Sequence, residues 1–157
     1  MDDAARFGPV VYRMRFDEAV AAGLIVPLRL LVYNASESYT RLCERHPQLA
    51  IALAGRRVEQ QRAELAVAMA DVMNERNLSK AFSFHPTVAE ARGFASDAAE
   101  LLPLLPGETP LVQAVWGALG SARIQAALEG AREAKRSIVA NPKVLDTGID
   151  APAVDLI

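Results

Sequence analysis

The sequence has a single cysteine, Cys43, so it can form no internal disulfide, which favours a reducing compartment. It has no apolar run approaching the roughly 20 residues that a transmembrane helix needs. Its acidic start, MDDAARFGPV, lacks the positive charge and apolar core of a secretory leader. We therefore expect a soluble, cytoplasmic protein with no membrane partner.

The sequence also lacks a surplus of positive charge. Seventeen Lys and Arg residues face 19 Asp and Glu residues, which gives a net charge of −2. Non-specific affinity for nucleic acid depends mainly on excess Lys and Arg, so a free-standing, high-affinity nucleic-acid binder is disfavoured, whereas weak or shared binding stays open. The length of 157 residues favours one domain with a real core.

Several motifs that carry chemistry are absent. The sequence contains neither the phosphate-binding pattern G-x-x-x-x-G-K-[ST] nor G-x-G-x-x-G, and its serines lack a G-x-S-x-G context. The two histidines, His46 and His85, have no Cys or acidic neighbour at metal-ligand spacing. We therefore predict no catalytic residue and no metal site.

In the first half of the chain, alternation in VVYRMRF predicts a short strand or an extended entry segment over 10–16. DEAVAAGLIVP predicts a helix from 17 that Gly23 and Pro27 end. LRLLVYN predicts a strand over 28–34 that ends at the breaker-like NASES, and a polar, helix-tolerant stretch follows over 37–55. The strongest helix signal covers 56–77. Its apolar stripe, which we expect to pack in the core, is Val58, Leu65, Met69, Val72 and Met73.

In the second half, strands alternate with helices. Strands are predicted over 80–86, 111–117, 136–141 and 153–157, with a three-proline loop over 103–110. Helices are predicted over 87–102, with Thr87 as N-cap and Glu90 completing a capping box, and from Ser121, also as a cap, to 135. This alternation predicts an α/β fold with a parallel sheet and helices on its faces.

Ligands of open parallel sheets bind beyond the carboxyl ends of the strands, here 83–87, 116–121 and 141–152. Gly148 permits a positive φ or a close approach of its backbone to a ligand. Asp150 can accept hydrogen bonds from a sugar hydroxyl, although bracing the turn before Pro152 is the favoured interpretation from the residues alone. Trp116 can pack in the core or stack on a base, and core packing is favoured.

The last 21 residues, SIVANPKVLDTGIDAPAVDLI, resemble motif V of superfamily II (DEAD/DEAH-like) helicases, with its strand, short turn, G-x-D-x-P and second strand. KAFSFHPTVAEARGFA, residues 80–95, resembles motif IV of the same enzymes. The first 33 residues resemble the connector of restriction and plasmid helicases, and WGALGSARIQAALEGAREAKRSIVAN resembles the segment between motifs IV and V. The resemblance covers nearly the whole chain, although residues 35–55 match loosely.

This resemblance implies that the chain has three parts. Residues 1–34 would be the connector from a first RecA-like domain, 35–78 a helical segment, and 79–157 a second RecA-like domain from motif IV to motif V, truncated before its last elements. The chain would contribute one side of an ATP and Mg²⁺ site and part of a nucleic-acid surface, with DNA preferred over RNA and the remainder of the helicase chain as partner. Gly148 and Asp150 would bind ATP. Near the nucleic-acid phosphates would lie Ser83, His85, Asn141 and Lys143.

The departures from the family pattern matter as well. The Walker A lysine, the DEAH acid pair and the Q-x-x-G-R-x-x-R of motif VI do not occur in the sequence. Phosphoryl transfer depends on these groups for positioning and charge neutralisation, so we expect the chain alone to be inactive as an ATPase. Two alternatives stay open: a non-enzymatic interaction module derived from a helicase, and the product of a truncated gene.

Overall fold

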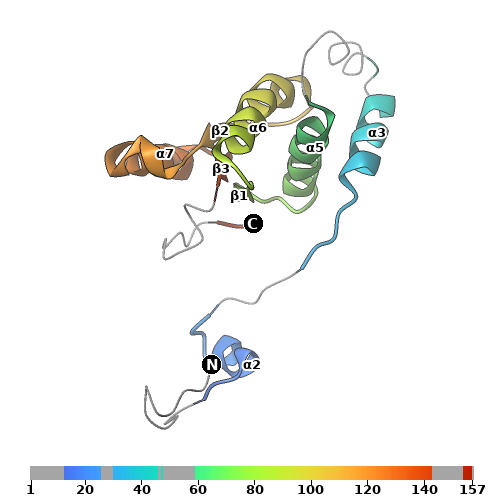
Figure 1. The fold of residues 1–157 in the computed structure, drawn as a ribbon. Helices are drawn as coiled ribbons and strands as arrows, with labels where there is room; N and C mark the ends of the chain where they lie inside the picture. The colour runs from blue at the N-terminus through green and yellow to red at the C-terminus, as the bar shows by residue number, and fades with distance from the viewer. Residues whose placement is uncertain (1–12, 26–29, 46, 48–58, 143–153, 157) are drawn as a thin grey trace. The chain divides into compact units, whose positions relative to one another are not determined.

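The computed structural model describes residues 13–25, 30–45, 47, 59–142 and 154–156. The chain divides into two compact units, Met1–Val32 and Tyr33–Ile157, which are described separately. Figure 1 shows the elements of both units along the chain.

The first unit contains helix α2, Phe16–Ala21. The carboxylate of Glu18 accepts a hydrogen bond from the backbone nitrogen of Arg15, the N-cap, at 2.9 Å, and so satisfies a free donor at the helix start. Gly23 has a φ of +69° directly after the C-cap, as predicted for a helix-ending glycine. For 10–16, predicted as a short strand or an extended entry segment, the described residues 13–15 form no strand, Arg15 is extended, and Phe16 begins α2.

The predicted strand over 28–34 is wrong in its described part, since 30–34 contain no strand. Leu30 and Val32 are 87% and 91% exposed, so their β-favouring side chains gain no packing that would fix an extended conformation. The NASES segment does not break structure either. The side chain of Asn34 accepts a hydrogen bond from the backbone of Glu37, and helix α3, Ala35–Arg45, begins within this segment.

Helix α5, Gln60–Glu75, confirms the main helix prediction. Met69, Val72 and Met73 are buried as expected, but Leu65 is 36% exposed, and Val58 lies outside the described residues. The buried surface is wider than the predicted stripe because α5 packs against α3 and against helix α6, Val88–Leu101 (Figure 1). Buried alanines of α5 lie in the clusters shared with these helices: Ala66 and Ala70 pack with α6, and Ala63 packs with α3 and the end of α6.

Three parallel strands form the sheet, in the order β1-β3-β2. They are β1 (Lys80–Phe84), β2 (Leu111–Ala114) and β3 (Ser137–Asn141), each slightly shorter than predicted. The register aligns Phe84 with Asn141 and Ala114 with Ala140, so the carboxyl ends lie at one edge. Of the predicted last strand, Leu156 makes a single parallel bridge to Ala81.

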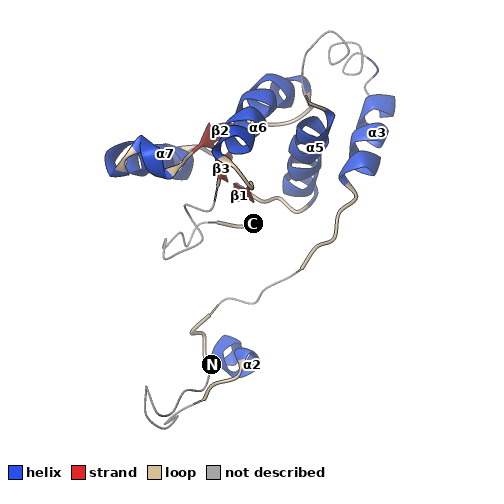
Figure 2. Cartoon of the chain, viewed as in Figure 1, coloured by secondary structure: helices blue, strands red, loops and turns tan. Residues whose placement is uncertain are grey.

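Helices cover both faces of the sheet. Helix α6 contributes Phe94 to a core cluster with Ile138 on one face, to which α5 adds Met73. Helix α7, Ser121–Glu133, contributes Ala131 to a second cluster with Val139 on the other face. Figure 2 shows the strands among these helices. The predicted α/β class with a parallel sheet is confirmed.

Local signals at the helix starts succeed once and fail once. The Thr87 side chain accepts a hydrogen bond from the backbone of Glu90 at 3.2 Å, so the predicted N-cap of α6 is confirmed. Ser121 does not cap α7. Gly120, with a φ of +79°, holds the N-cap position, and Ser121 is already the first helical residue. Between β2 and α7 lies the short 3-10 helix η2, Gly117–Leu119, and after α6 comes η1, Leu102–Leu104.

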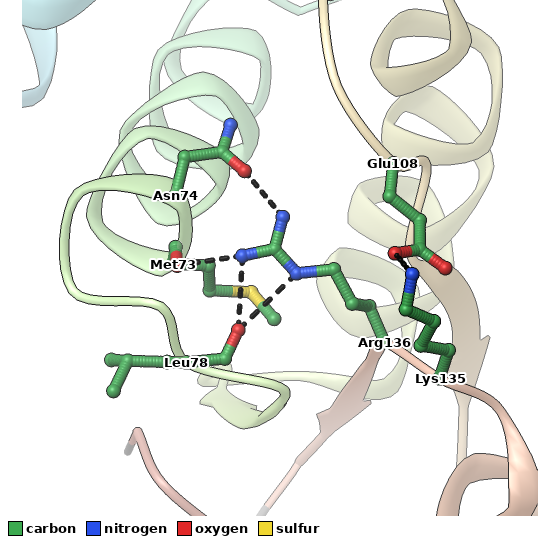
Figure 3. A network of polar contacts seen from close by, with 6 residues as sticks. All are labelled: Met73, Asn74, Leu78, Glu108, Lys135 and Arg136. Carbon is green, nitrogen blue, oxygen red and sulfur yellow. Dashed lines mark hydrogen bonds and ion pairs between the residues drawn. The ribbon is translucent and has the colours of Figure 1, made fainter.

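Arg136 ties the start of β3 to the end of α5 at the amino edge of the sheet (Figure 3). Its guanidinium donates to the carbonyl of Met73 at 2.6 Å, to the carbonyl of Leu78 at 3.0 and 3.2 Å, and to the side chain of Asn74. These bonds occupy carbonyls at and just beyond the helix C-terminus, where a positive charge is favourable. The neighbouring Lys135 instead pairs with Glu108 at 2.6 Å.

Candidate functional site

The chain crosses the sheet in one direction from β1 to β2 and then returns in the other direction to β3. The connection from β1 to β2 crosses β3 through α6, and the connection from β2 to β3 returns through α7. The two helices lie on opposite faces of the sheet. The segment that leaves β1 therefore runs to one face, and the segment that leaves β2 runs to the other. In open α/β sheets a reversal of this kind marks the carboxyl edge where ligands bind. The candidate site is therefore the carboxyl edge of β1, β3 and β2.

Three of the predicted site residues come together there. The hydroxyl oxygen of Ser83 lies 2.8 Å from Nε2 of His85, within hydrogen-bond distance. The backbone nitrogen of His85 donates to the carbonyl of Asn141 at 2.9 Å, and the Asn141 side-chain amide donates to the carbonyl of Ser83 at 3.3 Å. The exposed fractions of Ser83, His85 and Asn141 are 6%, 8% and 0%. The three residues form a buried polar cluster that joins the ends of β1 and β3.

His85 is held in a largely apolar setting. Its ring packs against Phe94 of α6 with 4.8 Å between ring centroids and a tilt of 40°. Burial lowers the pKa of His85, and the nearby Glu90 carboxylate opposes this only in part. His85 is therefore a neutral imidazole near pH 7. It forms one hydrogen bond with Ser83 and places no positive charge at the carboxyl edge.

An aromatic residue after β2 lies beside a cation of α6. Trp116 lies two residues beyond β2, is only partly buried and belongs to none of the core clusters of the described residues, so the expected core packing is not seen. The guanidinium carbon of the exposed Arg92, on α6, lies 5.3 Å from the centroid of the Trp116 ring. Sequence reasoning missed Arg92, because only the packing of α6 on the sheet brings it to Trp116. At the end of β1, Phe84 is 43% exposed.

The other predicted site residues, Lys143, Gly148 and Asp150, lie outside the described residues. They follow β3 in the chain, so the segment that contains them starts at this carboxyl edge. Within the described ranges, no cluster of three or more His, Cys, Asp or Glu side chains is arranged to hold a metal ion. In the same part of the chain, no helix is both long and apolar enough to cross a membrane.

Comparison with known proteins identifies no relative. No protein-family model matches the sequence, and searches of curated proteins and of solved structures find no significant match.

Proposed function

We propose that this chain is part of an ATP-dependent nucleic-acid helicase or translocase of superfamily II, and that its parallel sheet belongs to a RecA-like domain. The chain contributes one side of the ATP site and part of the surface that holds the nucleic acid. Its partners are DNA, in preference to RNA, and the remainder of the helicase chain.

One observation carries this proposal: β1 and β3, the strands that begin the segments resembling motifs IV and V, are neighbours in the sheet and end at the same edge. Phe84 and Asn141 are register partners, and His85 is hydrogen bonded to Asn141, although 56 residues separate His85 and Asn141 in the sequence. Both segments therefore leave neighbouring parallel strands at their carboxyl ends, where a nucleotide or a phosphate backbone is expected to bind. A chance likeness in sequence would not require the two segments to be neighbours.

The residues divide into two roles within the proposal. Ser83, His85 and Asn141 are buried and bonded to one another, so they fix the ends of β1 and β3 and position the segment after Asn141. Lys143 supplies the charge for a phosphate of the nucleic acid, and such contacts read shape and charge but not sequence. Gly148 and Asp150 face the nucleotide, with Asp150 accepting a hydrogen bond from the ribose.

ATP hydrolysis requires further groups. The sequence contains no Walker A lysine, no DEAH acid pair and no motif VI arginines, so Mg²⁺ and the β- and γ-phosphates have no complete set of contacts within it. We therefore expect the chain alone to show no ATP turnover. ATP hydrolysis by the purified chain, in the presence of Mg²⁺ and DNA, would contradict the proposal that the chain supplies only one side of the ATP site.

Nucleic-acid binding by the purified chain tests the proposal. The probe is a fluorescently labelled single-stranded DNA oligonucleotide, whose anisotropy is followed at low salt, with RNA of the same sequence as a second probe. We expect weak binding, with a Kd of roughly micromolar to 100 micromolar and a strong dependence on salt. DNA should bind at least as tightly as RNA.

Two lysine variants localise the contact. Lys143→Ala should weaken binding and reduce the salt dependence by about one phosphate contact. The matched control is Lys135→Ala, at the amino edge of the sheet, where the lysine is 81% exposed and pairs with Glu108. This control should bind as the unmodified chain does. If the two variants bind DNA with the same affinity, or if the unmodified chain binds no probe, the proposal is overturned. Either result would favour an interaction module for a protein partner or a gene remnant.

A further inference from the structure

Trp116 and Arg92 make a cation–π contact at the carboxyl edge of the sheet. The guanidinium carbon lies 5.3 Å from the ring centroid, within the distance at which an arginine is attracted to the face of an indole. The two residues come from different elements, since Arg92 lies on α6 and Trp116 follows β2. The contact therefore depends on the tertiary fold and not on sequence proximity.

The position of Trp116 differs from that of a core residue. Val115, directly before it, is fully buried in the cluster on the α7 face, whereas Trp116 keeps part of its surface exposed. The backbone that follows is small and open, because a Cβ atom added at Gly117 or Gly120 would meet nothing within 4 Å. A large aromatic side chain thus stands at the carboxyl edge, beside two glycines whose surroundings are open.

The chemistry of this pair suits an unpaired nucleobase. Indole offers the largest aromatic face among the side chains, and a planar guanidinium both stacks on bases and attracts phosphate. Proteins that hold single strands combine such stacking surfaces with positive charge. The bases of a duplex are already stacked on their neighbours, so the pair would favour single strands.

We propose that Trp116 and Arg92 form a stacking platform for an unpaired base of a single-stranded nucleic acid. This inference rests on the proposed function and adds to it a contact with a base, which the phosphate contact of Lys143 does not supply. The preference is for single strands over duplexes, without selection of a particular sequence.

The fluorescence of Trp116 tests the platform directly, because it is the only tryptophan of the chain. The unmodified chain is titrated with oligothymidylate and with an abasic oligonucleotide of equal length and charge. We expect oligothymidylate to quench the tryptophan fluorescence and to bind roughly 5- to 100-fold more tightly than the abasic strand, the range typical of a stacked base. Equal affinities without quenching would overturn the platform.

Variants add a second test that does not depend on the fluorophore. In anisotropy titrations of labelled oligothymidylate, Trp116→Leu should bind about tenfold more weakly, close to the affinity of the unmodified chain for the abasic strand. The aromatic control is Phe16→Leu in the first unit, where Phe16 is 59% exposed, and it should bind normally. Circular dichroism checks that both variants are folded. If Trp116→Leu is unfolded, the comparison of oligothymidylate with the abasic strand on the unmodified chain tests the platform instead.

Arg92→Gln should weaken the binding of oligothymidylate, whereas Arg132→Gln, at an exposed arginine of α7, should not. Unchanged affinity of Arg92→Gln would overturn the role of Arg92. Quenching by thymidine monophosphate at the same concentrations as by oligothymidylate would overturn the assignment to a strand.

The outcomes separate the two proposals. If abasic and normal strands bind equally, with a loss of affinity in Lys143→Ala, the platform is wrong and the proposed function stands. If neither strand binds, both are wrong.

Discussion

The hydroxyl of Ser83 and Nε2 of His85 lie 2.8 Å apart in the interior of the protein, at the end of β1. Because Nε2 belongs to a neutral ring, protonation of His85 would place among buried groups a charge that the Glu90 carboxylate compensates only in part. The cluster that joins β1 to β3 is thus sensitive to acid.

The first prediction concerns pH. Burial lowers the pKa of His85 in the folded protein below its unfolded value of about 6.5. The unfolded state therefore binds more protons between these two pKa values, and the contribution of His85 to stability is complete above about pH 6.5 and is lost as the pH falls through the folded pKa. The free energy of unfolding in urea, measured from pH 7.5 to 5, should fall over this window.

His85→Asn should flatten this pH dependence, because the titrating group is gone. His46→Gln, which removes the only other histidine, should leave it unchanged. The assignment fails if the two variants show the same slope as the unmodified chain.

The second prediction concerns the attachment of Leu156 to β1. The Asp155 carboxylate accepts hydrogen bonds from the backbone of Ser79 at 2.7 Å and of Lys80 at 3.0 Å, and from the Ser79 hydroxyl at 2.8 Å. Burial raises the pKa of Asp155, but these hydrogen bonds and the charge of Lys80 outweigh it and lower the pKa overall. Asp155→Ala should release residues 154–156 from β1.

Hydrogen exchange measures this release locally. The Phe82 amide donates to the carbonyl of Leu156 at 2.8 Å, so its exchange should accelerate in Asp155→Ala. The Val115 amide, bonded to Ala140 on the far side of the sheet, is the internal control. Acceleration of both amides alike would mean general destabilisation instead of local release.

The third prediction concerns Arg136 at the amino edge. Arg136→Ala removes its hydrogen bonds to Met73, Leu78 and Asn74 and should lower the free energy of unfolding by about 2 to 3 kcal/mol. Lys135→Ala, which breaks only an exposed ion pair, should cost less than about 1 kcal/mol. Urea unfolding of both variants provides the comparison, and equal losses would show that the Arg136 contacts contribute little.

The fold was predictable wherever a local signal coincided with tertiary packing. The Thr87 cap and the periodicity that follows it defined α6, and apolar runs bounded by turns defined the three strands. The run over 28–34 also contains β-favouring residues, but its described residues 30–34 form no strand, and Leu30 and Val32 lie exposed. Strand formation depends on such partners, and sequence composition does not show whether they exist.

The candidate site was predictable only in part. The rule that ligands bind at the carboxyl ends of parallel strands indicated the segments of Ser83, His85 and Asn141. The bonds of Asn141 with Ser83 and His85 depend on the parallel register of β1 and β3, which spacing along the chain does not determine. The contact of Arg92 with Trp116 depends in the same way on how α6 packs on the sheet.

NMR mapping of the DNA-binding surface tests the central claim most directly. Single-stranded DNA is added to the isotope-labelled chain, and shifts of backbone amide signals are followed residue by residue. The account predicts that the shifts concentrate at the carboxyl edge, in residues 84–87, 115–121 and 141–142, and in the segment 143–153 that follows in the sequence. Shifts concentrated at the amino edge, in residues 78–80, 108–111 and 135–137, or no shifts at all, would contradict it.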